Sequence, residues 1–264
     1  KLDHACNIVR IEGHQLMAQT RQQPENQQPR APLLVAELMD SGGLGEGLLP
    51  LAADAMSSGL VGRDALMLPR RLRVWAFVAE LRDCGTALDG AELTPASVGG
   101  VRLDTWLAFH EIKYYSSIDL PSAEYTPLTS EVLLFDAKFG EPPPHDAVLR
   151  VPAVADGVAN AVIWTWEVDL DDSGASDALL SNAPRAAKTH WRQAARLLPA
   201  EQCAAFGAGQ QLGLSFEQLT NGRELKFDVV TADRALRAAS APRRTRSHRP
   251  KVLRPPPAEP SAPA

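Results

Sequence analysis

The sequence predicts an α/β segment followed by an all-β unit, and three observations support this prediction. Residues 33–36 form a short apolar run closed by an acid, which is typical of a strand buried on both faces of an α/β sheet. Residues 48–60 carry apolar side chains at helical spacing. From about residue 83 to 235, strand-like runs recur between turn-forming clusters, a pattern typical of an all-β unit.

Length, charge and cysteine content narrow the class of protein. The 264 residues suffice for one large or two modest domains, and the net charge of -5 argues against direct nucleic-acid binding while suiting an enzyme for basic peptides. Three widely spaced cysteines without a CxxC pair indicate neither a disulfide framework nor a metal site. No apolar run approaches the roughly 18 residues of a membrane span, so we expect a soluble cytoplasmic or nuclear protein that does not bind membranes.

The first third of the chain is expected to alternate strands, loops and one helix. Residues 7–11 read as a strand, and residues 19–32, rich in glutamine, proline and arginine, read as a flexible loop. The helix predicted over residues 48–60 ends near Gly59, where glycine permits a left-handed turn. Residues 73–81 then form a strand that is apolar on both faces.

The β unit is expected to hold Trp164 and Trp166 in its core. Both tryptophans share one face of a predicted strand, which favours a core position over a methyl-lysine cage, because no third aromatic residue can be assigned to complete a cage. Asn221-Gly222 is a strong hairpin signal. The expected strands are residues 106–115, 130–135, 147–151, 160–169, 186–197, 211–216 and 224–230.

The most informative stretch for function is a glycine-rich loop bracketed by Glu37 and Glu46. Open α/β sheets bind ligands beyond the carboxyl ends of their strands, which is where Glu37 would lie. Two carboxylates there could bind a guanidinium, since its planar fork donates paired hydrogen bonds to carboxylate oxygens. The alternative, a glycine-rich connector whose acids are merely solvated, stays open on spacing alone.

Two motifs resemble those of the protein arginine N-methyltransferases. The segment ELMDSGGLGEGLLP at residues 37–50 resembles their double-glutamate loop and is most similar to the branch numbered 7 and 9, and residues 189–191 resemble their Thr-His-Trp loop. The resemblance implies a C-terminal remnant of a Rossmann-like S-adenosylmethionine-dependent methyltransferase domain followed by a β-barrel domain. The implied boundaries are residues 1–70 for the partial methyltransferase domain, 71–235 for the substrate-binding barrel and 236–264 for a disordered, basic, proline-rich tail.

The resemblance also implies roles for individual residues. Glu37 would anchor the substrate arginine, Glu46 would have the larger electronic role, and His190 would take part in proton removal. Thr189 and Trp191 would contact the substrate, with the indole forming a flat wall. The alternative for this triplet is a packed strand with one incidental histidine.

His14 and Gln15 occupy the place where the family sets groups beside the adenine of S-adenosyl-L-methionine, although a plain surface histidine is the alternative. The family's glycine-rich cofactor loop is not found upstream of Glu37, so the sequence reads as a fragment, a truncated gene model or a degenerate homologue. Two functions are therefore expected: an arginine methyltransferase acting on basic or Arg-Gly-rich proteins, as a dimer or tandem module, or a catalytically inactive homologue that serves as a protein-binding scaffold. The tail could be a nuclear localisation signal, a protein-binding segment or a solubilising segment.

Overall fold

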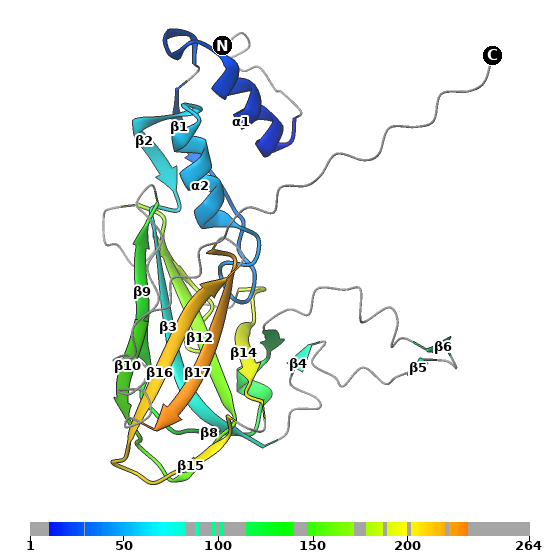
Figure 1. The fold of residues 1–264 in the computed structure, drawn as a ribbon, viewed down its shortest axis with the longest axis vertical. Helices are drawn as coiled ribbons and strands as arrows, with labels where there is room; N and C mark the ends of the chain where they lie inside the picture. Colours follow the sequence, from blue (N-terminus) through cyan, green and yellow to red (C-terminus); the bar gives the residue numbers. More distant parts are fainter. Residues whose placement is uncertain are drawn as a thin grey trace, which may run out of the picture.

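The structure is a computed structural model, and it shows a small α/β unit joined to a larger β region (Figure 1). It describes residues 11–28, 30–82, 88–89, 97–98, 101–102, 115–139, 147–171, 178–186, 189–199, 202–219 and 222–231.

The α/β unit is built on a parallel pair of strands. β1 (Ala31–Val35) pairs in parallel with β2 (Val61–Leu68), and helix α2 (Leu48–Ser57) lies between them in the chain. Helix α1 (Gly13–Gln22) and the short helix η1 (Glu25–Gln27) precede β1. The helices and strands share a buried core formed by Met17, Ala52, Ala55, Val61 and Met67. The α/β character predicted for this part of the chain is confirmed.

Glycines set both ends of α2. Gly47 caps its first turn with φ 85°, and Gly59 follows its C-terminal cap with φ 77°. Both are left-handed conformations that other residues rarely adopt. Leu48 and Ala52 face the interior, so the predicted helix is confirmed, with its end at Ser57.

Two expectations for this unit are wrong, and one strand was not predicted. Residues 19–22 continue α1 instead of forming a flexible loop, because Met17 and Thr20 are buried on one face of that helix. β1 is covered on one face only, and Leu33 and Val35 are 47% and 65% exposed. β2 was not predicted, because the polar residues near its start interrupt its apolar pattern; pairing with β1 forms the strand. The strand expected at residues 7–11 lies almost entirely outside the described residues.

β3 (Arg71–Leu81) is the central strand of the β region, by which we mean the described part of residues 71–231. It pairs antiparallel with β12 (Ala161–Asp169) on one side. On the other side it pairs antiparallel with β8 (Tyr125–Pro127) and β9 (Val132–Lys138). The rest of this eight-stranded sheet consists of β13 (Leu179–Ser181), β14 (Gln193–Leu197), β7 (Ser116–Ile118) and β4 (Leu88–Asp89).

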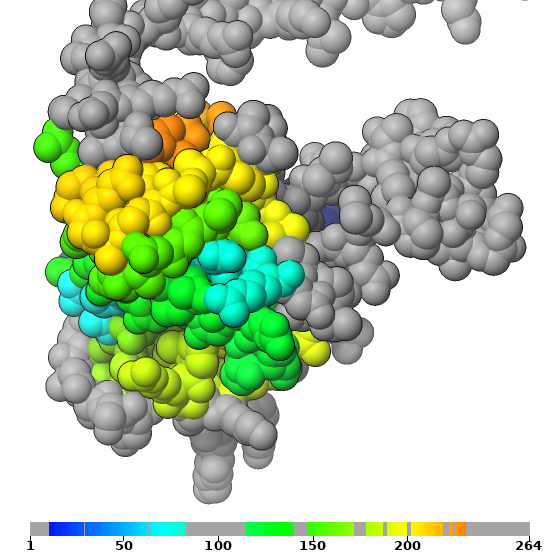
Figure 2. All heavy atoms as spheres, turned by 90° about the horizontal axis from the view of Figure 1, so that it is seen from below, coloured from blue at the N-terminus to red at the C-terminus, as the bar shows by residue number. Residues whose placement is uncertain are grey.

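A second antiparallel sheet packs against the first. It consists of β10 (Ala147–Pro152), β16 (Gln211–Leu219) and β17 (Glu224–Thr231), in that order. Smaller elements complete the described chain: β5 (Ser97–Val98), β6 (Val101–Arg102), η2 (Leu120–Ser122), β11 (Gly157–Ala159) and β15 (Ala204–Phe206). Viewed from the end remote from the helices, the segment around β15, drawn in yellow, lies across this end of the β region (Figure 2).

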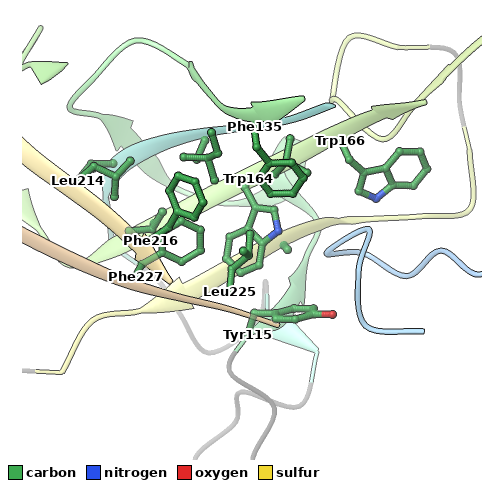
Figure 3. Close-up of a cluster of buried hydrophobic side chains, with 14 of the residues drawn as sticks. Tyr115, Phe135, Trp164, Trp166, Leu214, Phe216, Leu225 and Phe227 are labelled. Carbon is green, nitrogen blue, oxygen red and sulfur yellow. The ribbon is translucent and has the colours of Figure 1, made fainter. Parts of the chain in front are cut away.

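The core of the β region is aromatic. Trp164 and Phe227 lie with ring centroids 5.0 Å apart, and Tyr115 meets Trp164 edge to face at 5.1 Å (Figure 3). Trp164 and Trp166 are 1% and 0% exposed, so the predicted core position of both is confirmed. The predicted fold class, an α/β part followed by a β domain, is confirmed as well.

Most of the predicted strands occur, with shifted ends. Only the last part of residues 186–197 is a strand, because residues 189–192 form a loop before β14 begins at Gln193. The antiparallel β16–β17 pair confirms the predicted hairpin, and Gly222 has φ 83° in its turn. The strand expected at residues 106–115 lies outside the described residues except for Tyr115, and the tail from residue 236 lies outside them entirely.

Two leucines of the β region test this core. Leu214 on β16 is fully buried, whereas Leu197 on β14 is 38% exposed. We expect Leu214→Ala to lower the free energy of unfolding by about 2–5 kcal/mol, because the removed atoms leave a cavity. Leu197→Ala should cost less than about 1 kcal/mol. Urea denaturation followed by tryptophan fluorescence measures both values, and equal losses would contradict the described packing.

Candidate functional site

The double-glutamate loop, residues 37–47, connects β1 to α2 and folds around Asp40. The amide of Gly43 donates to the Asp40 carbonyl at 3.0 Å, and the amide of Gly45 donates to the Asp40 carboxylate at 3.2 Å. The hydroxyl of Tyr115 donates to the same carboxylate. Asp40 therefore fixes the shape of the loop and ties it to the β region.

Glycine is required in this loop because the β region approaches its backbone closely. A Cβ atom on Gly42 would lie 2.6 Å from the ring of Tyr115, and one on Gly43 would lie 2.8 Å from the ring of Trp166. Gly43 also has φ 80°, a left-handed conformation. In Figure 3 the loop, drawn in blue, runs beside the Trp166 and Tyr115 side chains.

The Thr-His-Trp segment, residues 189–191, contacts this loop, although the two are separated by about 150 residues in the sequence. The indole N–H of Trp191 donates to the Met39 carbonyl at 2.8 Å. His190 stacks on Trp191 with ring centroids 4.0 Å apart, and Trp191 in turn meets Trp166 edge to face at 5.2 Å. The structure thus brings together the two motifs that the sequence analysis singled out.

Glu37 and Glu46 lie at the two ends of the loop, and both side chains are exposed. Within the described parts of the chain, neither carboxylate has a hydrogen-bond or ion-pair partner. His190 is also exposed, and Thr189 donates its hydroxyl to the Trp191 carbonyl at 3.5 Å. The arrangement leaves two acids and one imidazole accessible on a backbone that is itself held in place.

Several residues of the site were not predicted from the sequence. Trp166 and Trp164 donate their indole N–H groups to the carbonyls of Asp40 and Gly42, at 2.9 and 3.2 Å. Asn182, which is 1% exposed, donates its amide to the carbonyl of Ser41 at 3.0 Å. The need of a buried indole N–H for an acceptor is the one signal in the sequence that could have indicated such bonds.

His14 and Gln15, the residues expected beside adenine, lie on the first turn of α1. Both side chains are exposed, and His14 lies 3.2 Å from the carboxylate of Glu12. Two polar side chains on one helical turn could hydrogen-bond a nucleobase, but they form one wall of a site and do not enclose an adenosyl group. The described residues thus fit the cofactor only in part.

Among the described residues, no group of three His, Cys, Asp or Glu side chains is arranged to hold a metal ion. No helix in the same ranges has the length and apolarity needed to cross a membrane.

Sequence comparisons relate the chain to arginine methyltransferases. It is 33% identical over 175 residues to protein arginine N-methyltransferase 7 of Drosophila ananassae, which covers 61% of this chain and 24% of that protein. It is 26% identical over 208 residues to protein arginine N-methyltransferase 7 of Danio rerio, covering 72% of this chain and 30% of the relative. The chain thus spans about a quarter of the length of the curated relatives it matches. The predicted resemblance to this family, near the branch that includes number 7, is confirmed.

No protein-family model matches the chain. Among solved structures it is similar to the Trypanosoma brucei PRMT1 enzyme-prozyme heterotetrameric complex with AdoHcy, with a TM-score of 0.48, 16% identity, and coverage of 76% of this chain and 65% of the other.

The close approach at Gly43 can be tested against a matched glycine. Gly43 and Gly209 have nearly the same φ, 80° and 83°, but a Cβ on Gly209 would meet no atom within 4 Å. Gly209→Ala should therefore cost only the left-handed backbone term of about 1 kcal/mol. Gly43→Ala should cost about 2–4 kcal/mol, because its methyl group also collides with Trp166. Chemical denaturation of both variants gives the comparison, and equal costs would contradict the described contact.

Proposed function

We propose that this chain, as a relative of the protein arginine N-methyltransferases, carries the arginine-binding part of an enzyme that methylates a guanidine nitrogen of protein arginine. One observation supports the proposal above all others. The Thr-His-Trp segment lies against the double-glutamate loop, through the 2.8 Å hydrogen bond from Trp191 to the Met39 carbonyl. This bond supports the proposal because it joins the segment that carries His190 to the loop that carries Glu37 and Glu46, the residues that we assign to the arginine.

The two glutamates would bind and orient the guanidinium. A guanidinium is a poor nucleophile because its lone pairs are delocalised over three nitrogens. Carboxylates hydrogen-bonded to its two sides would hold the positive charge away from the third nitrogen. Glu37 and Glu46 are exposed and free of partners among the described residues, so neither would have to break an existing bond to receive the substrate. We assign Glu37 to anchoring and Glu46 to the larger electronic effect.

His190 would accept the proton that the methylated nitrogen must lose. Its imidazole is exposed beside the loop and is held by its ring contact with Trp191, and histidine is a common general base in proteins. Trp191 is tied to Met39 through its N–H, so the part of its indole that remains accessible could cover the aliphatic stem of the substrate arginine. An acidic chain suits basic or Arg-Gly-rich protein substrates.

S-adenosyl-L-methionine, when bound, would supply a methyl group on a positively charged sulfur, a strong electrophile. His14 and Gln15 are the described residues that we assign to its adenine. The work of the described chain is then positional: it holds one guanidine nitrogen in line with that methyl group, and alignment alone can account for much of such a reaction.

Substitution of the glutamates tests the proposal. In the full-length gene product we expect Glu46→Gln to lower methyl transfer to an arginine peptide by at least ~100-fold, because it removes a charge aimed at the substrate cation. Glu37→Gln should weaken peptide binding by about tenfold. Transfer of radiolabelled methyl groups and isothermal titration measure the two effects. Glu131→Gln, at an exposed acid of the β region, is the matched control and should change neither quantity.

A peptide with citrulline in place of arginine isolates the charge. Citrulline keeps the shape of the side chain but is neutral, so it should bind much more weakly than arginine to the unmodified chain. Near-normal transfer by Glu46→Gln would contradict the assignment. Preferential binding of the arginine peptide without any transfer would instead favour the scaffold function.

A further inference from the structure

We infer that four side chains of the β region, Trp191, Trp166, Asn182 and Trp164, act as a clamp that positions Glu37 and Glu46 for the arginine. This inference rests on the function proposed above and adds positioning residues to it. None of the four needs to touch the substrate for the clamp to work.

The clamp binds four successive backbone carbonyls. The carbonyl of Met39 receives the N–H of Trp191 at 2.8 Å, and that of Asp40 receives the N–H of Trp166 at 2.9 Å. The next two carbonyls are bound in the same way. Asn182 donates to Ser41 at 3.0 Å, and Trp164 donates to Gly42 at 3.2 Å. Backbone carbonyls in surface loops usually accept hydrogen bonds from water. In this loop, each of the four carbonyls instead accepts a hydrogen bond from a different side chain.

The donors are themselves rigid, so they can fix the loop. Trp164 and Trp166 are fully buried neighbours on β12, and an indole N–H can only donate, so each must find an acceptor. Asn182 is held on three sides. Its oxygen accepts the Trp166 amide at 2.7 Å, while its nitrogen donates to the carbonyls of Arg192 and Ser41 at 2.7 and 3.0 Å.

Asn182 also links the two halves of the site. Through Arg192 it binds the residue that follows the Thr-His-Trp segment, and through Ser41 it binds the middle of the double-glutamate loop. A displacement of either segment would stretch a bond to this one amide. The clamp therefore sets the glutamates relative to His190 and does more than fasten the loop to the protein.

The bound carbonyls stand between the two acids. Glu37 precedes Met39 by two residues, and Glu46 follows Gly42 by four. Asp40 carries the constraint toward Glu46, because its carboxylate binds the amide of Gly45 and the hydroxyl of Tyr115. Misplacement of a binding group by about 1 Å can cost about 100-fold in rate, so a fixed backbone beneath two free acids serves the proposed chemistry.

Removal of one N–H tests the clamp. Trp166→Phe keeps a buried ring but removes the donor to Asp40, and the side chain is too deeply buried to touch a peptide. We expect hydrogen exchange of the Gly43, Gly45 and Gly47 amides to accelerate about tenfold, while exchange of the β16–β17 hairpin is unchanged. Arginine-peptide affinity should fall although both glutamates remain. Nuclear magnetic resonance and titration supply the readouts.

Trp75→Phe is the matched control. Its indole N–H also makes a side-chain hydrogen bond in the β region, to Glu167 at 3.3 Å, but does not reach the loop. It should leave loop exchange and peptide affinity unchanged. If Trp166→Phe does not fold, Trp191→Phe, at a half-buried position, replaces it for the exchange measurement.

The outcomes separate this inference from the proposed function. Unchanged loop exchange would overturn the clamp, and so would equal acceleration in loop and hairpin, which would indicate a general structural role. Faster loop exchange with undiminished peptide affinity would overturn the positioning role. An unmodified chain that does not bind the arginine peptide would count against the proposed function, while the exchange data would still decide whether the clamp holds the loop.

Discussion

The structure depends on the contact between the double-glutamate loop and the β region. Residues 39–42 offer four backbone carbonyls to N–H donors that stand on the β region, two of them the neighbouring tryptophans of β12. Met39 and Leu44 from the same loop are buried in the main hydrophobic core with Trp164. The β region thus both buries the apolar side chains of the loop and donates hydrogen bonds to its backbone. Loss of one set of contacts would therefore weaken the other.

This contact divides the loop into a fixed and a free part. Its backbone is held by directed hydrogen bonds, which have narrow geometric tolerance, and its glycines allow the rings of Tyr115 and Trp166 to approach. The two carboxylates at its ends remain exposed. This division favours binding of a charged group. The backbone of the loop loses its conformational entropy during folding, so only the two glutamate side chains have to be ordered when the ligand binds.

The sequence predicted the elements better than it predicted their contacts. Helix α2, strand β12 and the β16–β17 hairpin follow from local rules: helical spacing closed by Gly59, a continuous apolar run, and an Asn-Gly turn. The covering of β1 did not follow, because burial of Leu33 and Val35 depends on what lies against the strand. That the Thr-His-Trp segment lies near the double-glutamate loop, as the bond from Trp191 to Met39 shows, was expected only from family resemblance. The roles of Asn182 and Tyr115 were not predictable, because each depends on a long-range hydrogen bond that leaves no local pattern.

The same contact explains how a small α/β unit keeps its place. Parallel strands normally lie in sheets covered on both faces, yet here α2 covers one face, while Leu33, Val35 and Leu66 remain exposed on the strands. Within the described residues, the double-glutamate loop attaches this unit to the β region through the carbonyls of residues 39–42 and the buried side chains of Met39 and Leu44. The segment that presents the acids is therefore also one of the segments that join the two parts, beside the direct connection from β2 to β3 and the packing of Phe139 against the α/β core. Any change that loosens the attachment must therefore disturb the site as well.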